Sequence, residues 1–144
     1  MRNGGVLASL CLLGVACGGG DSTGPQVQNI AGTYNYSVPN LSAQGLTCRA
    51  RATMVLTQHS ASFAGTYTGD LVCTASGYYD STGSAGAVAN GGISGDSVYF
   101  DFDNTNWHDM GVIAGGSLQG LVNVHISANG TPMVLAGNFT ATKQ

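Results

Sequence analysis

The stretch from residue 120 to 139, GLVNVHISANGTPMVLAGNF, decides the fold class. Asn129-Gly130 at its centre is a strong signal for a type I′ turn, since Asn and Gly both tolerate the positive φ that this turn needs. Apolar and polar residues alternate on both sides of the turn, as in a half-buried strand. The pairs expected on the apolar face are Ile126–Met133, Val124–Leu135, Val122–Gly137 and Gly120–Phe139. The stretch therefore predicts an antiparallel hairpin with one apolar face.

Two similar segments precede this hairpin, GGISGDSV at 91–98 and GVIAGGSL at 111–118. Each predicts a hairpin with a two-residue turn, at Gly95-Asp96 in the first and Gly115-Gly116 in the second. Ile93 would pair with Val98, and Ile113 with Leu118. The repeat has the length of one hairpin, so it indicates regular up-and-down strands.

The first half of the domain alternates in the same way, over residues 30–38 and then over 46–75. A tight turn at His59-Ser60 would place Leu56 opposite Phe63 and Met54 opposite Gly65. A two-residue bulge around Gly69-Asp70 would then bring Cys73 opposite Cys48.

The whole pattern predicts an all-β domain with eight antiparallel strands in an up-and-down meander. The expected strands are 30–38, 46–58, 61–75, 87–94, 97–103, 107–114, 117–127 and 131–141. Closure into a small barrel would remove the exposed strand edges. A two-sheet β-sandwich is the structural alternative, and a membrane-spanning barrel would alternate with its apolar side outward. The many Gly and Ala residues on the apolar face favour a narrow interior.

Composition excludes other classes. Of 144 residues 23 are Gly and only 8% are charged, with a net charge of −3. Runs of good helix formers are missing after the first 16 residues. Without a basic patch, nucleic-acid binding is not expected.

The N-terminus has the features of an export signal. Arg2 is followed by a largely apolar run from Val6 to Val15, which is too short to cross a membrane as a helix. The run ends in Gly14-Val15-Ala16-Cys17 and resembles the lipobox of bacterial lipoproteins, although Gly14 stands where that family prefers Leu. The resemblance implies cleavage after residue 16 and lipidation of Cys17.

The segment after Cys17 is GGGDSTGP, a flexible polar tether. The expected organisation is a signal at 1–16, the lipidated Cys and tether at 17–29, and a β-barrel domain at 30–144. In lipoproteins Asp after the Cys tends to retain the protein at the inner membrane. Gly18 is there instead, so the resemblance implies an outer-membrane lipoprotein in the cell envelope.

Cys48 and Cys73 remain as an even pair, since Cys11 lies in the signal. In an oxidising compartment they are expected to form a disulfide. Closing that loop would contribute roughly 3–4 kcal/mol on the chain-entropy model. Two free thiols and a metal pair are the alternatives.

The apolar face supplies a set of aromatic residues for the barrel interior. They are Tyr34, Tyr36, Phe63, Tyr67, Phe100, Phe102 and Phe139. The architecture resembles lipocalins and the streptavidin group, with Gly32-Thr33-Tyr34-Asn35 and Phe63-Ala64-Gly65-Thr66-Tyr67 similar to two strands of the latter. That likeness implies an interior that is packed or holds one small apolar ligand, and it does not carry biotin binding because the chain has one Trp.

The densest polar cluster runs from Asp101 to Asp109. Oxygen ligands at alternate positions suit Ca²⁺, so Asp101, Asp103 and Asp109 are weak candidates for a calcium site. The run lacks the Gly and Glu of an EF-hand loop and is also ordinary for a solvated turn. His108 beside Asp109 predicts a surface pair, and no nucleophile elbow accompanies it. We expect no enzyme, no cofactor and no metal.

The longest connection in the domain is expected at 76–86. It carries Tyr78, Tyr79 and Asp80, and adjacent exposed Tyr side chains in a loop suit recognition of a sugar or a protein. A loop that packs its own aromatic residues is the alternative.

These observations predict a non-catalytic lipoprotein, anchored in the envelope by lipid, that binds a partner at the barrel mouth or the 76–86 loop. A carrier of a small apolar ligand inside the barrel is the second hypothesis. An inhibitor of an envelope protease is the third.

Overall fold

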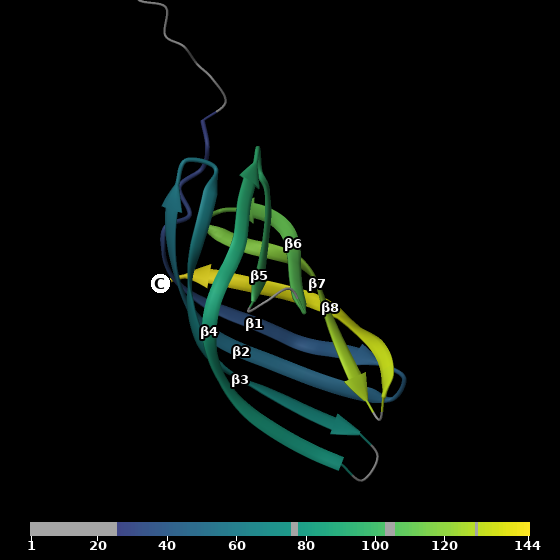
Figure 1. Ribbon diagram of the computed structural model, residues 1–144. Coiled ribbons are helices and arrows are strands. Elements are labelled where there is room, and N and C mark those ends of the chain that lie inside the picture. Colours follow the sequence, from purple (N-terminus) through teal and green to yellow (C-terminus); the bar gives the residue numbers. More distant parts are fainter. Residues whose placement is uncertain (1–25, 76–77, 103–105, 129) are drawn as a thin grey trace, which may run out of the picture.

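The computed structural model describes residues 26–75, 78–102, 106–128 and 130–144. They form eight antiparallel strands joined in chain order, and pairing of the last strand with the first closes a barrel (Figure 1). The strands are β1 (Gly32–Ala43), β2 (Leu46–His59), β3 (Ser62–Ala75), β4 (Tyr78–Ser94), β5 (Ser97–Phe102), β6 (Trp107–Ala114), β7 (Ser117–Ala128) and β8 (Thr131–Lys143). The up-and-down barrel is confirmed, and the sandwich alternative is wrong.

The registers of the hairpins in the second half are confirmed. All four pairs expected across the β7–β8 hairpin are present, from Ile126 with Met133 to Gly120 with Phe139. Ile93 pairs with Val98, and Ile113 with Leu118. Positive φ at Gly95, Gly115, Gly116 and Gly130 fits the tight turns at these positions. The turn residues therefore specify the register of these hairpins, which the alternation of apolar and polar residues alone does not fix.

The apolar face of the alternation lines the interior. Tyr34, Phe100 and Phe139 are each 1% exposed, within a single cluster of buried apolar residues. Burial of this face supplies the main favourable free energy of folding. Within the described ranges no helix occurs, so the strands provide this burial alone. The same part of the chain holds no helix that is long and apolar enough to cross a membrane.

The register of the β2–β3 hairpin differs from the expected one. His59 pairs with Ser62, so the turn lies at Ser60-Ala61 with a positive φ at Ser60. Leu56 is therefore opposite Gly65, and Met54 is opposite Tyr67. The bulge expected at Gly69-Asp70 is wrong, because pairing continues without interruption to Cys48 opposite Cys73.

The disulfide itself is present, with Sγ atoms of Cys48 and Cys73 bonded at 2.09 Å. The two half-cystines are direct cross-strand neighbours, with Cα atoms 4.0 Å apart. The bond therefore links the start of β2 covalently to the end of β3.

Two strands are longer than expected. β1 continues past Pro39 to Ala43, because a register shift between Val38 and Leu41 lets both side chains point inward. Proline is tolerated at such an irregularity. β4 begins at Tyr78, so the expected loop at 76–86 is wrong: most of that segment is strand paired with β3.

The two ends of the barrel are built differently. The closed end holds the turns at Ser60-Ala61, Gly95-Asp96 and Gly115-Gly116. There Ile30, 1% exposed, covers the interior. Its backbone N–H donates to Gln58 Oε1 at 2.7 Å, and its carbonyl accepts from the Tyr34 hydroxyl at 2.9 Å. The N-terminal segment thus enters the domain at this end (Figure 1).

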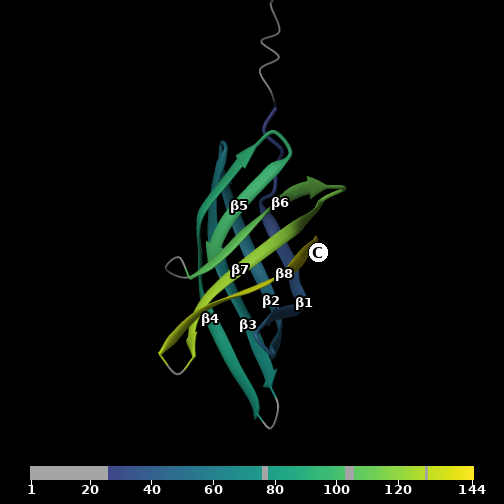
Figure 2. The same cartoon turned by 90° about the vertical axis from the view of Figure 1, so that its right-hand side faces the viewer.

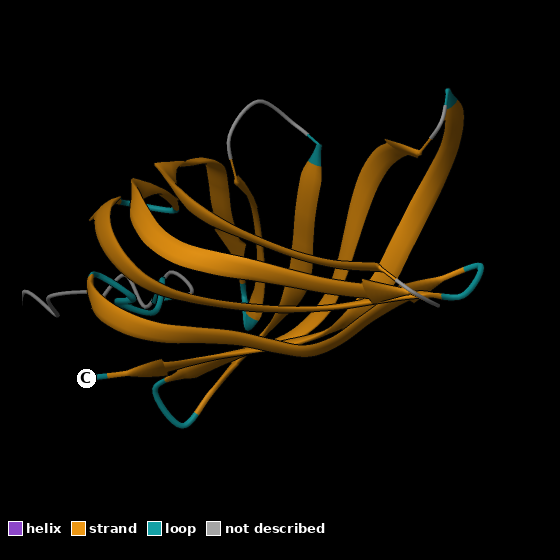
Figure 3. Ribbon diagram, turned by 90° about the horizontal axis from the view of Figure 1, so that it is seen from below, coloured by secondary structure: helices purple, strands orange, loops and turns teal. Residues whose placement is uncertain are grey.

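The open end lies opposite, where β5 and β6 stop early. β4 pairs with β5 only between Val88 and Ser94. In Figure 2 the β5–β6 pair stands in the upper part of the barrel, whereas β3 and β4 continue to the bottom. Seen from below in Figure 3, the domain is strand throughout, with loops only where strands end.

Candidate functional site

The short β5 and β6 strands expose part of the inner barrel face. Thr82 and Ser84 of β4 lie opposite Leu71 and Gly69 of β3, on the side that faces the interior. Both are nevertheless solvent-exposed, because no strand crosses in front of them. The alternation that buries side chains at the closed end therefore produces an accessible concave surface at the open end.

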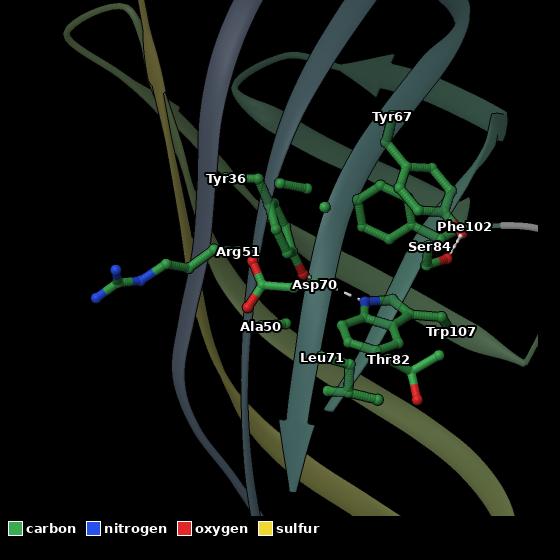
Figure 4. A pocket seen from close by; sticks show the side chains of 12 residues that line it. Tyr36, Ala50, Arg51, Tyr67, Asp70, Leu71, Thr82, Ser84, Phe102 and Trp107 are labelled. Atoms are coloured by element: carbon green, nitrogen blue, oxygen red, sulfur yellow. Dashed lines mark hydrogen bonds between the residues drawn. The ribbon is translucent and has the colours of Figure 1, made fainter. Parts of the chain in front are cut away.

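A cavity of about 230 Å³ opens at this end (Figure 4). Strands β1 to β4 supply most of its wall, and the ends of β5 and β6 supply the rest. It is lined by Tyr36, Ala50, Arg51, Ala52, Tyr67, Gly69, Asp70, Leu71, Thr82, Ser84, Phe102 and Trp107. Small residues on β2 and β3 leave this space, because Ala50, Ala52 and Gly69 occupy inward positions where larger side chains would fill it.

Four aromatic rings form one side of the cavity, and we call them the aromatic wall: Tyr36, Tyr67, Phe102 and Trp107. Phe102 is at the centre and contacts the other three edge to face. Its ring centroid lies 5.0 Å from that of Tyr36, 4.6 Å from Tyr67 and 5.8 Å from Trp107. Such T-shaped contacts stabilise the arrangement beyond the area they bury. The wall is therefore a rigid, largely apolar surface with three polar edge atoms.

Those polar atoms are hydrogen-bonded. The Trp107 indole N–H donates to the Tyr36 hydroxyl oxygen at 3.2 Å, as the dashed line in Figure 4 shows. The Tyr67 and Ser84 hydroxyls share a hydrogen bond at 3.0 Å. The Tyr36 hydroxyl in turn donates to Asp109 Oδ1 at 2.7 Å. A chain of hydrogen bonds thus leads from the cavity wall to a carboxyl group behind it.

Asp109 is unusual because it is a carboxylic acid inside an apolar barrel. It is 2% exposed and is the only buried charged residue among those described. Its cross-strand neighbours are Phe100 and Val122, neither of which can compensate a charge. Oδ2 has no hydrogen-bond partner in the described part of the chain. An unpartnered buried polar atom costs free energy, so such atoms are uncommon in cores.

Burial raises the pKa of Asp109 well above its usual range. The hydrogen bond from Tyr36 and the nearby indole N–H of Trp107 act in the opposite direction, and the nearby charge of Asp101 adds to the rise. Burial likewise raises the pKa of Tyr36, and the Asp109 charge contributes. Burial therefore disfavours the charged form of this carboxyl unless a compensating charge lies nearby.

The aromatic residues expected inside the barrel fall into two groups. Tyr36 and Phe102 belong to the buried cluster and, with the partly buried Tyr67, also border the cavity at the open end. The others pack in the core: Tyr34, Phe63, Phe100 and Phe139. The barrel is therefore packed at one end and hollow at the other, a combination that the sequence pattern did not distinguish.

The three Asp residues considered for calcium are not brought together. Asp101 points to the outer surface, where its carboxylate contacts His108 Nδ1 at 2.7 Å and Asn90 Nδ2 at 2.7 Å. Asp109 lies on the opposite side of the barrel wall, and Asp103 is outside the described residues. No cluster of three or more potential metal ligands occurs in the described ranges.

The expected surface pair of His108 with Asp109 is wrong. Neighbouring residues of a strand point to opposite faces, so His108 faces solvent and Asp109 faces the core. His108 pairs with Asp101 of β5 instead, its direct cross-strand neighbour.

Tyr78, Tyr79 and Asp80 lie at the start of β4 and pair along β3 as strand residues. Their side chains are outside the described set, as is Cys17. The backbone at 78–80 is therefore strand and not loop, and the recognition role expected of these residues stays a prediction.

Sequence reasoning missed Trp107 and the burial of Asp109, and it took Ala50 and Ala52 on the inner face as signs of a narrow interior, whereas they line the cavity. The signal for Asp109 was present, because in strand 107–114 it shares a face with Trp107 and with Ile113, the apolar residue predicted to pair with Leu118.

No protein-family model matches this chain, and comparison with curated proteins and with solved structures found no similar protein.

Proposed function

We propose that this protein is a non-catalytic binding protein of the bacterial envelope that holds a small, largely apolar ligand in the open-end cavity. The single observation that carries the proposal is the cavity itself, bounded by the aromatic wall on one side and by small residues on the other. Ligand sites are typically concave and apolar, with a few polar groups that orient the ligand.

The size of the cavity limits the ligand. About 230 Å³ is less than the pockets that hold drug-sized molecules. An apolar cavity of about 150 Å³ is enough for benzene. The ligand, or the part of it that enters, is therefore on the scale of one substituted ring or a short branched chain.

The lipid anchor at Cys17 remains part of the proposal, on the strength of its lipobox-like sequence. One structural feature is consistent with it. The segment from Gln26 joins the barrel at the closed end, where the Gln28 side chain contacts Asp96 and its carbonyl accepts from Gln58. A tether from the membrane to this end would leave the cavity at the far end accessible to ligand.

The test uses Trp107, which is the only Trp in the chain and lines the cavity. Its single indole N–H signal in an NMR spectrum reports on the cavity without further labelling. Toluene, cyclohexanol and hexan-1-ol serve as neutral probes. We expect at least one to shift the signal in a saturable manner.

Two matched variants make this test specific. Ala52→Leu fills the cavity and should abolish the shift. Ala64→Leu adds the same atoms on the exposed outer face of β3 and should leave it unchanged. Absence of any saturable shift with all three probes would overturn the proposal, as would equal behaviour of the two variants.

A second candidate function, binding of an envelope protein, is favoured by one outer surface. Tyr99, Met110 and Leu121 are direct neighbours across β5, β6 and β7 and are 52%, 71% and 62% exposed. A row of exposed apolar side chains is a common feature of interaction sites. Crosslinking in the native host should then yield a partner with the wild type that the double variant Met110→Ser, Leu121→Ser loses; no difference would remove this candidate.

A further inference from the structure

The aromatic wall and the carboxyl behind it together restrict the chemistry of the ligand. The rings do not lie flat on one plane. The Phe102 ring stands at 77° to Tyr36, 73° to Tyr67 and 85° to Trp107. The rings thus pack edge to face on one another, and Tyr67 and Trp107, which are only partly buried, contribute accessible ring surface to the cavity lining. Aromatic ring faces carry negative potential and attract alkylated ammonium groups.

The second observation is the unpartnered Oδ2 of Asp109. The residue is one hydrogen bond away from the cavity, since the Tyr36 hydroxyl that bonds Oδ1 belongs to the wall. A neutral ligand in the cavity would not compensate a charge on this carboxyl group. A cation in the cavity would stabilise the ionised carboxylate, since an opposite charge nearby favours the charged form.

Other ligand charges fit less well. An anion would meet a buried carboxyl and a protein of net charge −3. Arg51 is the only cationic residue that lines the cavity, and Figure 4 shows its guanidinium directed away from the rings. Among the described residues, no positive group therefore lies at the rings to compete with a bound cation or attract an anion, and the lining includes a further acidic residue, Asp70.

We propose that the open-end cavity binds a small organic cation of the alkylated ammonium class, in contact with the aromatic wall and balanced by the Asp109 carboxylate behind it. This inference rests on the proposed function, because it names the ligand class of the same cavity. The methyl groups of such a cation would contact the rings. The ring faces and the carboxylate would compensate for the water molecules that the cation loses on binding.

The decisive experiment compares two probes of nearly the same shape. Choline carries a trimethylammonium group, and 3,3-dimethylbutan-1-ol has carbon in place of its nitrogen. Both are titrated into the full folded domain, and binding is followed by the Trp107 indole signal. We expect choline to bind about tenfold more tightly or better, a difference within the range of a desolvated cation–π contact.

Asp109→Asn separates the carboxylate from the rings. Asn has nearly the same shape and can still accept from the Tyr36 hydroxyl. We expect it to weaken choline binding about tenfold or more while the affinity for dimethylbutanol stays unchanged. Asp96→Asn, which removes the same charge at the exposed turn of the closed end, is the matched control and should alter neither.

The pH dependence of wild-type binding provides a measurement that needs no variant. The groups that face Asp109 are Tyr36 from β1 and Trp107 on its own strand, and Phe100 and Val122 on the flanking strands carry no charge. Asp101 acts through the barrel wall from the outer face. Since burial raises the pKa of Asp109, choline binding should strengthen as pH rises through that pKa, while dimethylbutanol binding stays constant.

The outcomes distinguish the two proposals. Equal affinity for choline and dimethylbutanol, or a choline affinity independent of both pH and Asp109, would overturn the cation assignment and leave a small-ligand cavity standing. No response to either compound, or to the three neutral probes, would overturn both.

Discussion

The closed and open ends of this barrel use the same strand pattern for opposite purposes. At the closed end inward side chains from all parts of the sheet meet, and Phe63, Phe100 and Phe139 are at most 5% exposed. At the open end Thr82 and Ser84 also point inward but are exposed. The difference shows that alternation specifies which face is concave, whereas the lengths of β5 and β6 decide whether that face is filled.

Truncation of a large core side chain at the closed end should cause the largest loss in the free energy of unfolding. Phe139 is 1% exposed and contacts the rings of Tyr36 and Phe100 at 5.6 Å. We expect Phe139→Ala to lower the free energy of unfolding by about 3–5 kcal/mol, through lost burial and the cavity left behind. Leu71→Ala, at the half-buried open end, should cost less than half as much. Urea denaturation of both variants measures this, and equal losses would mean that the two ends are packed alike.

Removal of the disulfide tests whether this covalent bond provides stability at the open end, where the inward side chains of Thr82 and Ser84 are exposed. Cys48 and Cys73 lie on the part of β2 and β3 that extends toward this end, 25 residues apart in sequence. We expect the double variant Cys48→Ala, Cys73→Ala to lose roughly 3–4 kcal/mol by the chain-entropy model. Chemical denaturation under oxidising conditions checks the value. A loss below about 1 kcal/mol would show that strand pairing alone holds this end.

The sequence predicted the hairpins of the second half well and the first half of β4 poorly, for a physical reason. Turn residues with positive φ and full apolar alternation specified the hairpins at 91–98, 111–118 and 120–139. The segment 81–87, STGSAGA, has neither, because its inward residues Thr82 and Ser84 border the open cavity and stay exposed. A strand without a buried face has no hydrophobic period and resembles a loop. The end of β1 was missed for a similar reason, because the alternation is interrupted at the register shift between Val38 and Leu41, where Pro39 lies.

The candidate site was only partly predictable. The parity of Tyr36, Tyr67 and Phe102 indicated an inward position, and the structure agrees. Their meeting at one hollow end depends on the early stop of β5 and β6, which strand propensity does not reveal. Asp109 was taken for a surface residue because polar residues around it suggested a turn, although its parity with Ile113 pointed inward.

The buried acid predicts an unusual pH dependence of stability. Burial raises the pKa of Asp109 in the folded state above its unfolded value. Below the unfolded pKa, near 3.9, both states hold the proton and the contribution is fully present. As pH rises toward the folded pKa, the unfolded state loses its proton first, so stability falls by up to about 1.4 kcal/mol per pH unit.

The matching measurement is urea denaturation of wild type and Asp109→Asn between pH 3.5 and 8, values chosen to bracket that titration. The difference in unfolding free energy, wild type minus variant, should decrease as pH rises from about 4. Asp96→Asn, on the exposed turn, serves as the comparison. A difference that stays flat would mean that the interior around Asp109 is hydrated enough to hold a charge, which would make the two ends more alike than their burial indicates.

The smallest effect concerns two glycines of one strand, β4. At Gly83, near the open end, an added methyl group would meet no atom within 4 Å, whereas at Gly91 it would meet the backbone and ring of Phe63. Because Gly costs backbone entropy in a strand, Gly83→Ala should stabilise the fold by about 0.5 kcal/mol. Gly91→Ala should destabilise it, since the packed end cannot yield without moving a core ring. The melting temperatures of the two variants test this. If both substitutions stabilise the fold, the core beside Gly91 can accommodate an extra methyl group, and the two ends are packed more alike than their burial indicates.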